Sequence, residues 1–320
     1  MLKYIIKRLL QAIPLLLVIS FIVFGLIELA PYDIVDSMIS PNMSQATIDL
    51  IRARHGLDQP FLARYWLWLQ AIFHGDFGNS LIHGTNIRND LAVRIPNTIR
   101  LVLPAYAAAL ILAIIFGMVA GANRGKWQDA AIDGLCSLGI ASPTFWFAML
   151  LIYFLGFRLN LFPIIGMYTV GGDRSFGDFL RHFTMPFLTL TFAFWPGLCR
   201  YIRASTISQM NQDYVMVQQA FHASKWEIYS RHISRNILIP IVTQIGMALP
   251  MLVTGAIITE SVFSWPGVGP YLMSATRALD YPIVMAVMLL SAVLVILGNL
   301  LSDILYSIVD PRIRRGGGSK

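Results

Sequence analysis

The sequence predicts an all-α membrane protein with six transmembrane helices. Of the 320 residues, 56% are hydrophobic and only 13% are charged, whereas a soluble domain carries about 25% charged residues. Apolar runs also recur at the length that a membrane requires, because a hydrocarbon core of about 30 Å takes roughly 20 helical residues. The expected spans are residues 9–30, 99–122, 133–157, 183–203, 237–262 and 282–308.

The first span is expected to be retained rather than removed as a signal peptide. Lys3, Lys7 and Arg8 precede its apolar run, as they would in a signal peptide. The run nevertheless continues to Ala30, which is long enough to cross the bilayer, and no small-residue cleavage site follows it.

Basic residues indicate that both termini face the cytoplasm. Lys and Arg collect in the short cytoplasmic loops of membrane proteins. The short loop after the second span carries Arg124 and Lys126, and the loop after the fourth span is also basic. An even number of spans places both ends on one side, so we expect an N-in, C-in topology. The same rule accounts for the net charge of +7 without a nucleic-acid partner.

A long outer loop, residues 31–98, separates the first two spans. A helical pattern follows Ser44, and the amphipathic, aromatic run 61–69 is typical of a helix lying at the membrane interface. The glycines between residues 75 and 80 predict turns. The loop is large enough to cap a pore or to receive an external partner.

Small residues and prolines shape the second, third and fourth spans. Gly117 and Gly121 are four residues apart, a spacing that lets helices approach closely in lipid. Pro143, Pro186 and Pro196 each remove a backbone donor and are expected to bend their helices.

The glycine-containing loop after the second span does not form a phosphate-binding loop. Its glycine spacing is one residue short, and Trp127 stands where Ser or Thr would hold magnesium. The chain is therefore not expected to hydrolyse ATP by that device.

No catalytic or metal-binding group is apparent either. The histidines are scattered over loops, and the two cysteines, Cys136 and Cys199, lie in apolar runs, which argues against a disulfide framework or a metal site.

Polar residues at membrane depth are few, and they are the candidates for a gate or for structural pairing. Arg200 and Arg203 end the fourth span, while Asn299 and Asp303 lie one turn apart on the sixth. An ion pair between helices is one interpretation, and a latch that opens with the gate is the other. Glu260, near the outer end of the fifth span, is expected to be a snorkelling or capping carboxylate.

The chain resembles the permease subunits of binding-protein-dependent ABC importers of the dipeptide, oligopeptide and nickel group. The most specific motif is the run 260–269, ESVFSWPGVG. Weaker motifs follow the family's order over nearly the whole chain: GLDQP at 56–60, DFGNS at 76–80, DYV at 213–215, DYP at 280–282 and DPR at 310–312.

The resemblance implies a type I ABC importer fold and several partners. These are a second permease, which we expect to be a related heterodimer partner, two ATPase subunits or domains, and an extracytoplasmic substrate-binding protein. ATP and magnesium would be bound by the ATPases, and this chain would hold no cofactor. The implied regions are a first helix at 1–30, the outer loop 31–98, a core at 99–310 with a coupling loop at 204–236, and a cytoplasmic tail at 311–320.

The resemblance also implies a short coupling helix that fits a groove on the ATPase, with Phe221 and Trp226 as apolar anchors. The family places a glycine in this loop where the present chain has His222, so the bend is either shallower or matched by an adapted ATPase. The residues assigned to coupling are Gln218, Gln219, Ala220, Phe221, His222, Ala223, Ser224, Lys225, Trp226 and Glu227.

The run after the fifth span is expected to turn back as a short hairpin that shapes the outer mouth. Its assigned residues are Glu260, Trp265, Pro266, Gly267 and Gly269.

Three functions remain open from the sequence. The first is a permease for di- or oligopeptides in a bacterial cytoplasmic membrane, and the second is the same machinery carrying nickel or a chelated metal. An intramembrane enzyme or a stand-alone channel is the third, although Asp303 is then the one deep carboxylate available. The terminal residues 316–320, GGGSK, are expected to be a flexible tail or an added linker.

Overall fold

The computed structural model describes residues 2–29, 43–54, 59–224, 227–234, 236–237, 241, 244 and 257–309. Throughout these ranges the chain is helical, apart from its connecting loops and one isolated bridge between Asn79 and Asn86. Most of the expected fifth span and the whole tail 311–320 fall outside them, as do the first three residues of the motif at 56–60 and part of the outer loop.

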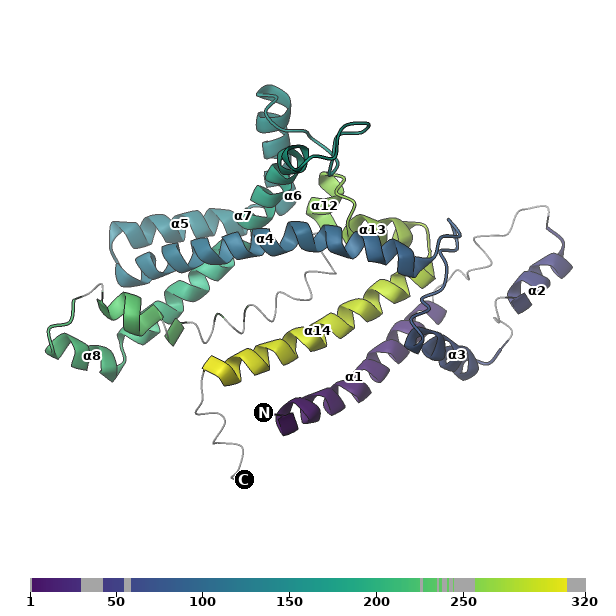
Figure 1. Ribbon diagram of the computed structural model, residues 1–320, viewed down its shortest axis with the longest axis horizontal. Coiled ribbons are helices and arrows are strands. Elements are labelled where there is room, and N and C mark those ends of the chain that lie inside the picture. The colour runs from purple at the N-terminus through teal and green to yellow at the C-terminus, as the bar shows by residue number, and fades with distance from the viewer. Residues whose placement is uncertain are drawn as a thin grey trace.

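Two long helices, α4 (Ile87–Ala122) and α7 (Phe176–Met210), pack along each other at the centre of the molecule (Figure 1). The expected second and fourth spans lie within them. Helix α4 begins earlier than expected, at Ile87, because the side chain of Asn86 accepts a hydrogen bond from the N–H of Asn89 (3.3 Å).

Small residues allow the close contact between α4 and α7. A Cβ atom at Gly117 would lie 2.8 Å from the carbonyl oxygen of Cys199, and one at Gly121 would lie 2.6 Å from Cβ of Thr206. The predicted packing role of both glycines is therefore confirmed. Alanines extend the same face of α4, so that buried small residues recur every four positions: Ala105, Ala109, Ala113, Gly117 and Gly121.

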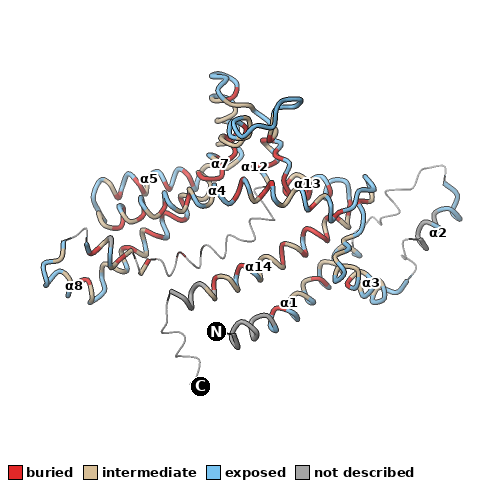
Figure 2. Tube along the Cα trace, viewed as in Figure 1, coloured by how far each residue is buried: buried red, intermediate tan, exposed pale blue. Residues whose placement is uncertain are grey.

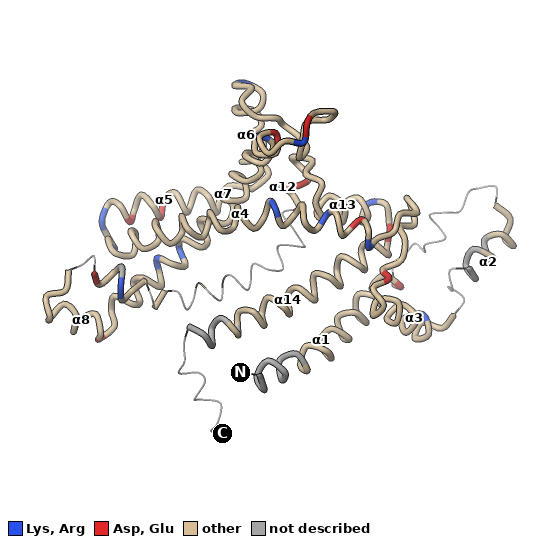
Figure 3. The backbone as a smooth tube through the Cα atoms, viewed as in Figure 1, with Lys and Arg blue, Asp and Glu red and all other residues tan. Residues whose placement is uncertain are grey.

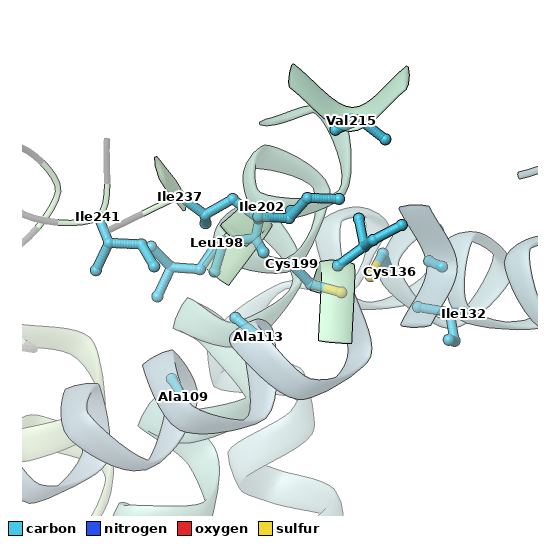
Figure 4. Close-up of a cluster of buried hydrophobic side chains, with 13 residues drawn as sticks. Ala109, Ala113, Ile132, Cys136, Leu198, Cys199, Ile202, Val215, Ile237 and Ile241 are labelled. Carbon is cyan, nitrogen blue, oxygen red and sulfur yellow. The ribbon is translucent and has the colours of Figure 1, made fainter. Parts of the chain in front are cut away.

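The largest apolar cluster joins these two helices to α5 (Trp127–Ala141) and α8 (Asp213–Ala220) (Figure 4). It includes Cys136 and Cys199, which are buried free thiols. Figure 2 shows buried residues along the facing sides of α4 and α7, while the outward sides of the helices remain exposed.

The expected third span is broken rather than bent. Helix α5 ends at Ala141, and α6 (Thr144–Leu151), which continues as the π-helical segment η1 (Ile152–Arg158), leaves at 97° to it. Ser142 and Pro143 between them are extended, with ψ of 122° and 134°. A residue before proline is disfavoured in the helical region, so Pro143 ends α5 instead of kinking it.

A second group contains α1 (Leu2–Glu28), α14 (Tyr281–Val309) and α3 (Phe61–Phe73). Helices α1 and α14 pack antiparallel, so the start of α1 and the end of α14 lie at the same end of the molecule (Figure 1). Helix α3 packs on α1 through aromatic rings, with Phe61 and Tyr65 both in edge-on contact with Phe21. The expected interfacial helix at 61–69 is thus a real helix, and a shorter one, α2 (Gln45–Arg54), precedes it.

Three of the described helices have segments long and apolar enough to cross a membrane: Leu10–Glu28, Ile87–Ala122 and Tyr281–Ser302. The bent pair α5 and α6–η1 would make a fourth span if it is counted as one. Helix α7, which contains the expected fourth span, is not among them. Figure 3 shows long uncharged stretches in the coloured parts of α1 and α14, whereas charged residues occur within α4, α5 and α7.

Candidate functional site

An exposed apolar surface lies on α8, in the stretch where coupling is expected. Val215 is 1% exposed and anchors the helix to the large apolar cluster. Met216, Val217 and Phe221 point away from that cluster and are 71%, 50% and 81% exposed. We call these three residues the α8 surface. A helix held by one side and apolar on another is suited to insertion into a groove on a partner.

Helix α8 ends in a tight left-handed turn at His222, which has φ +60°. The N–H of His222 donates to the carbonyl of Gln219 (3.0 Å), and the N–H of Ala223 donates to the carbonyl of Gln218 (3.0 Å). This pair of bonds is the Schellman cap, which places a left-handed residue, most often glycine, just past the helix end. His222 therefore adopts a left-handed backbone conformation that glycine adopts more readily than other residues.

The expected coupling helix over 218–227 is wrong as a single element. The left-handed turn stops α8 at Ala220, and the chain is helical again at Glu227, whose N–H donates to Oγ of Ser224 (3.2 Å). It continues as the π-helical segment η2 (Ile228–Ile233). Lys225 and Trp226 lie outside the described residues.

The two arginines at the end of the expected fourth span form ion pairs with α5. Arg203 makes a bidentate pair with Asp129, with Nε–Oδ1 of 2.5 Å and an Nη2–Oδ2 distance of 2.8 Å. Arg200 contacts Asp133 through Nε (3.1 Å) and Ser137 through a second nitrogen (2.6 Å). Both arginines thus form ion pairs between helices, with partners on α5 that were not among the expected residues.

Of the other two gate candidates, Asn299 does not join this group. Asn299 is exposed on α14, a helix that packs against α1 and α13 (Val268–Arg277). The side chain of Asp303 lies outside the described residues. Two further carboxylates, Asp129 on α5 and Glu260, are buried within the protein. A polar stripe at spacing four on α5, Asp129, Asp133 and Ser137, is the signal that would have identified the arginine partners.

The expected outer-mouth residues form a buried turn between α12 (Ile257–Val262) and α13. Glu260 is fully buried, and its Oε2 accepts a hydrogen bond from the N–H of Gly269 (2.8 Å) in the first turn of α13. The expected capping role of Glu260 is confirmed, since a carboxylate at a helix N-terminus binds free N–H groups and opposes the helix dipole.

The glycines of this turn make room for that carboxylate. A Cβ atom at Gly267 would lie 2.4 Å from Oε2 of Glu260, and one at Gly269 would lie 2.8 Å from the same oxygen. The 260–269 motif thus needs glycine at 267 and 269 because the buried carboxylate of Glu260 occupies the space that a side chain would take.

Two residues of α4 hold the turn in place. The indole N–H of Trp265, which is fully buried, donates to the carbonyl of Asn97 (2.9 Å), and the amide of Asn97 donates to the carbonyl of Pro266 (3.0 Å). The N–H of Val268 donates to the hydroxyl of Thr98 (2.9 Å). Asn97 and Thr98 carry no recognisable motif, which is why sequence reasoning missed them.

The loop before α7 is fixed by a carboxylate of the helix's first turn. The N–H and the hydroxyl of Thr169 each donate to Asp178 at 2.7 Å. These two bonds hold the pKa of Asp178 below its usual range. This loop is therefore tied to α7 at Thr169.

The described part of the chain holds no group of three His, Cys, Asp or Glu side chains that could bind a metal ion. The two sites are the exposed apolar α8 surface and the turn capped by Glu260, which packs against Asn97 and Thr98 of α4.

Comparison with known proteins identifies the family. Residues 113–315 match the family described as binding-protein-dependent transport system inner membrane component, and residues 1–102 match its N-terminal membrane component. The oligopeptide transport system permease protein AppB of Bacillus subtilis (strain 168) is 36% identical over 98% of this chain and 99% of its own length. A putative peptide permease of Brucella ovis is 37% identical over the same shares of each chain. The glutathione transport system permease protein GsiC of Escherichia coli (strain K12) is 33% identical, again over 98% and 99%. The chain belongs to the family of binding-protein-dependent transport system inner membrane components.

Proposed function

We propose that the chain is the membrane-spanning permease subunit of an ABC importer and forms part of the translocation path for di- or oligopeptides. The observation that carries this proposal is a sequence identity of 33–37% to permease proteins over nearly the whole chain. Those relatives are named for oligopeptides, peptides and glutathione, which favours a peptide cargo over nickel or a chelated metal.

The importer would contain a second, related permease, two ATPase subunits and an extracytoplasmic binding protein, in a bacterial inner membrane. ATP and magnesium belong to the ATPases. Six spans with both termini in the cytoplasm agree with the charge distribution. The arrangement in Figure 1 supports this topology, because α8, the loop 123–126, the start of α1 and the end of α14 all lie toward one end. The core would then extend over 99–310, with the coupling loop at 204–236.

The α8 surface is the part of this chain that would receive work from the ATPase. Its three apolar side chains stand on a helix that Val215 anchors, so a displacement of α8 would be passed to α7 and α4. The Schellman cap at His222 fixes where Phe221 points. The capped turn at Glu260 would keep the outer mouth rigid while the inner ends move.

Replacing Phe221 by alanine tests this assignment. Phe221 is 81% exposed, and loss of an interface anchor costs about 2 kcal/mol, which weakens association roughly 30-fold. We expect Phe221→Ala to reduce both retention of the ATPase on the purified permease and peptide-stimulated ATP hydrolysis. Phe176→Ala, which removes a 74% exposed ring at the other end of α7, is the matched control. If Phe221→Ala and Phe176→Ala retain the ATPase and hydrolyse ATP equally well, α8 is not part of the coupling interface.

A further inference from the structure

A groove with a volume of about 730 Å³ lies beside the last turns of α4, in the size range of ligand pockets. Its floor is a stripe of that helix, Ile114, Ile115, Met118 and Val119. Met210 at the end of α7 and Ile228 of η2 face the stripe. The α8 surface and the outer-mouth turn do not line this groove, although Met210, Gln219 and Ile228 belong to the proposed coupling loop.

The groove has the length and position of half a bilayer. From Ile114 to Ala122, the last lining residue of α4, the helix rises about 12 Å. One leaflet of the hydrocarbon core is about 15 Å deep. Helix α4 ends at Ala122, and Trp127, 76% exposed, follows within a few residues. Exposed tryptophan beside a helix end is typical of the membrane–water interface. The apolar floor therefore ends where a lipid headgroup would begin.

The rim of the groove at that end is polar and positively charged. Lys126, Asn123 and Gln219 line it. The ammonium of Lys126 lies 3.5 Å from Oδ1 of Asn123, and no carboxylate in the described part of the chain forms an ion pair with it. Asp129, the nearest acidic residue along the chain, is engaged by Arg203. The positive charge of Lys126 is thus available to an anion at the mouth.

We propose that this groove binds an anionic phospholipid of the surrounding membrane, with an acyl chain along the α4 stripe and the headgroup phosphate beside Lys126. Basic pockets between transmembrane helices on the cytoplasmic side are suited to anionic headgroups. The assignment of the lipid to the cytoplasmic leaflet rests on the proposed topology. The lipid would contact α4, α7 and η2 together, next to the helix that carries the α8 surface.

The test is native mass spectrometry of the purified full chain, with the subunits that co-purify, in the presence of phosphatidylglycerol or phosphatidylethanolamine of identical acyl chains. We expect phosphatidylglycerol to be retained more strongly. Lys126→Gln should reduce that preference about fivefold, the effect of one basic residue near an anionic headgroup. Arg124→Gln is the matched control, since Arg124 is exposed in the same loop but does not line the groove.

A second pair of variants tests the acyl-chain part of the groove. Ile115→Trp fills the apolar floor and should abolish retention of both lipids, whereas Ile111→Trp, at a 59% exposed position one turn away and outside the groove, should not. Unchanged thermal unfolding would show that both variants fold.

Three results would overturn the proposal: equal retention by wild type and Lys126→Gln, an equal loss with Arg124→Gln, or loss of the lipid when the importer assembles. The last result would mean that a protein subunit covers the groove. Because lipid retention in detergent depends neither on transport nor on sidedness, its failure is distinguishable from failure of the proposed function.

Discussion

At the scale of single residues, two arginine–aspartate pairs join α5 to α7, and they differ in burial. The side chains of Arg203 and Asp129 are 28% and 7% exposed and make two short bonds. Those of Arg200 and Asp133 are 42% and 45% exposed and share one. Solvent screens the attraction between Arg200 and Asp133. Removing one partner of the Arg203–Asp129 pair instead leaves a charge that water solvates poorly.

Asp129→Asn is therefore expected to lower the free energy of unfolding by about 1.5–3 kcal/mol, the range for a hydrogen bond to a charged group. Asp133→Asn should cost at most about 1 kcal/mol, because exposed ion pairs contribute little. Unfolding of the purified chain by sodium dodecyl sulfate measures both. Similar losses for the two variants would show that burial does not govern these pairs.

The packing of Glu260 under α13 predicts a non-additive pair of substitutions. Gly267→Ala should cost about 1–3 kcal/mol by overpacking, because its Cβ would lie 2.4 Å from the carboxylate. Glu260→Ala should also destabilise, because it removes the cap of Gly269. In the double variant the clash is absent, so the measured loss should be smaller than the sum of the single losses.

Thermal unfolding of the two single variants and the double variant measures this coupling. Gly197→Ala is the control, since a methyl group on this α7 glycine would meet nothing within 4 Å. Strictly additive losses would mean that the carboxylate and the glycine do not share the space.

Sequence reasoning at this scale identified residues better than it identified their partners. The motif at 260–269 was recognisable, and capping was one of the two roles expected for Glu260. Asn97 and Thr98, which bind the 260–269 turn, lie on a helix more than 160 residues earlier in the sequence. No local sequence pattern marks them. Asp129 was overlooked because the expected third helix was placed from residue 133 onward, after the start of α5.

At the scale of elements, the contact between α4 and α7 depends on the missing side chains of two glycines. Gly117→Leu should place its side chain against Ile202, whose Cβ lies 2.9 Å from the position of a new Cβ. In lipid, close backbone approach replaces the hydrophobic effect as the source of helix association. We expect a loss of at least about 1–3 kcal/mol, measured as earlier unfolding in detergent.

Gly134→Leu is the matched control for that prediction. Gly134 lies in α5, and a Cβ atom there would meet nothing within 4 Å. A larger effect at Gly134 than at Gly117 would contradict the assignment of the α4–α7 contact as the central one.

Element boundaries show which sequence signals suffice. Residues 9–28 of the first expected span and the expected spans at 99–122 and 282–308 lie in real helices, because long apolar runs specify them without tertiary information. Breaks were harder: Pro143 was expected to bend a helix that it instead divides, while Pro186 and Pro196 leave α7 continuous. Helix α8 ends just before His222, which has a left-handed conformation that histidine rarely adopts. From the residue types alone, a longer helix was therefore expected.

At the scale of the whole molecule, the outward faces of several helices are apolar. Leu10 of α1 is 61% exposed and Leu138 of α5 is 66% exposed. Such surfaces are stable in contact with lipid or with another subunit, but not with water. A chain of this family therefore completes its surface only in the membrane and in its assembly.

The proposed topology predicts which loops can be reached from outside the cell. Arg124, in the loop after α4, should face the cytoplasm, and Val170, which is 101% exposed in the loop before α7, should face outward. The native thiols of Cys136 and Cys199 are 1% and 0% exposed, so a membrane-impermeant maleimide should not label them. Val170→Cys should then be labelled in intact cells, and Arg124→Cys only after permeabilisation. Labelling of Arg124→Cys from outside would place α8 on the wrong side of the membrane to meet an ATPase, because α8 and that loop lie at the same end of α4.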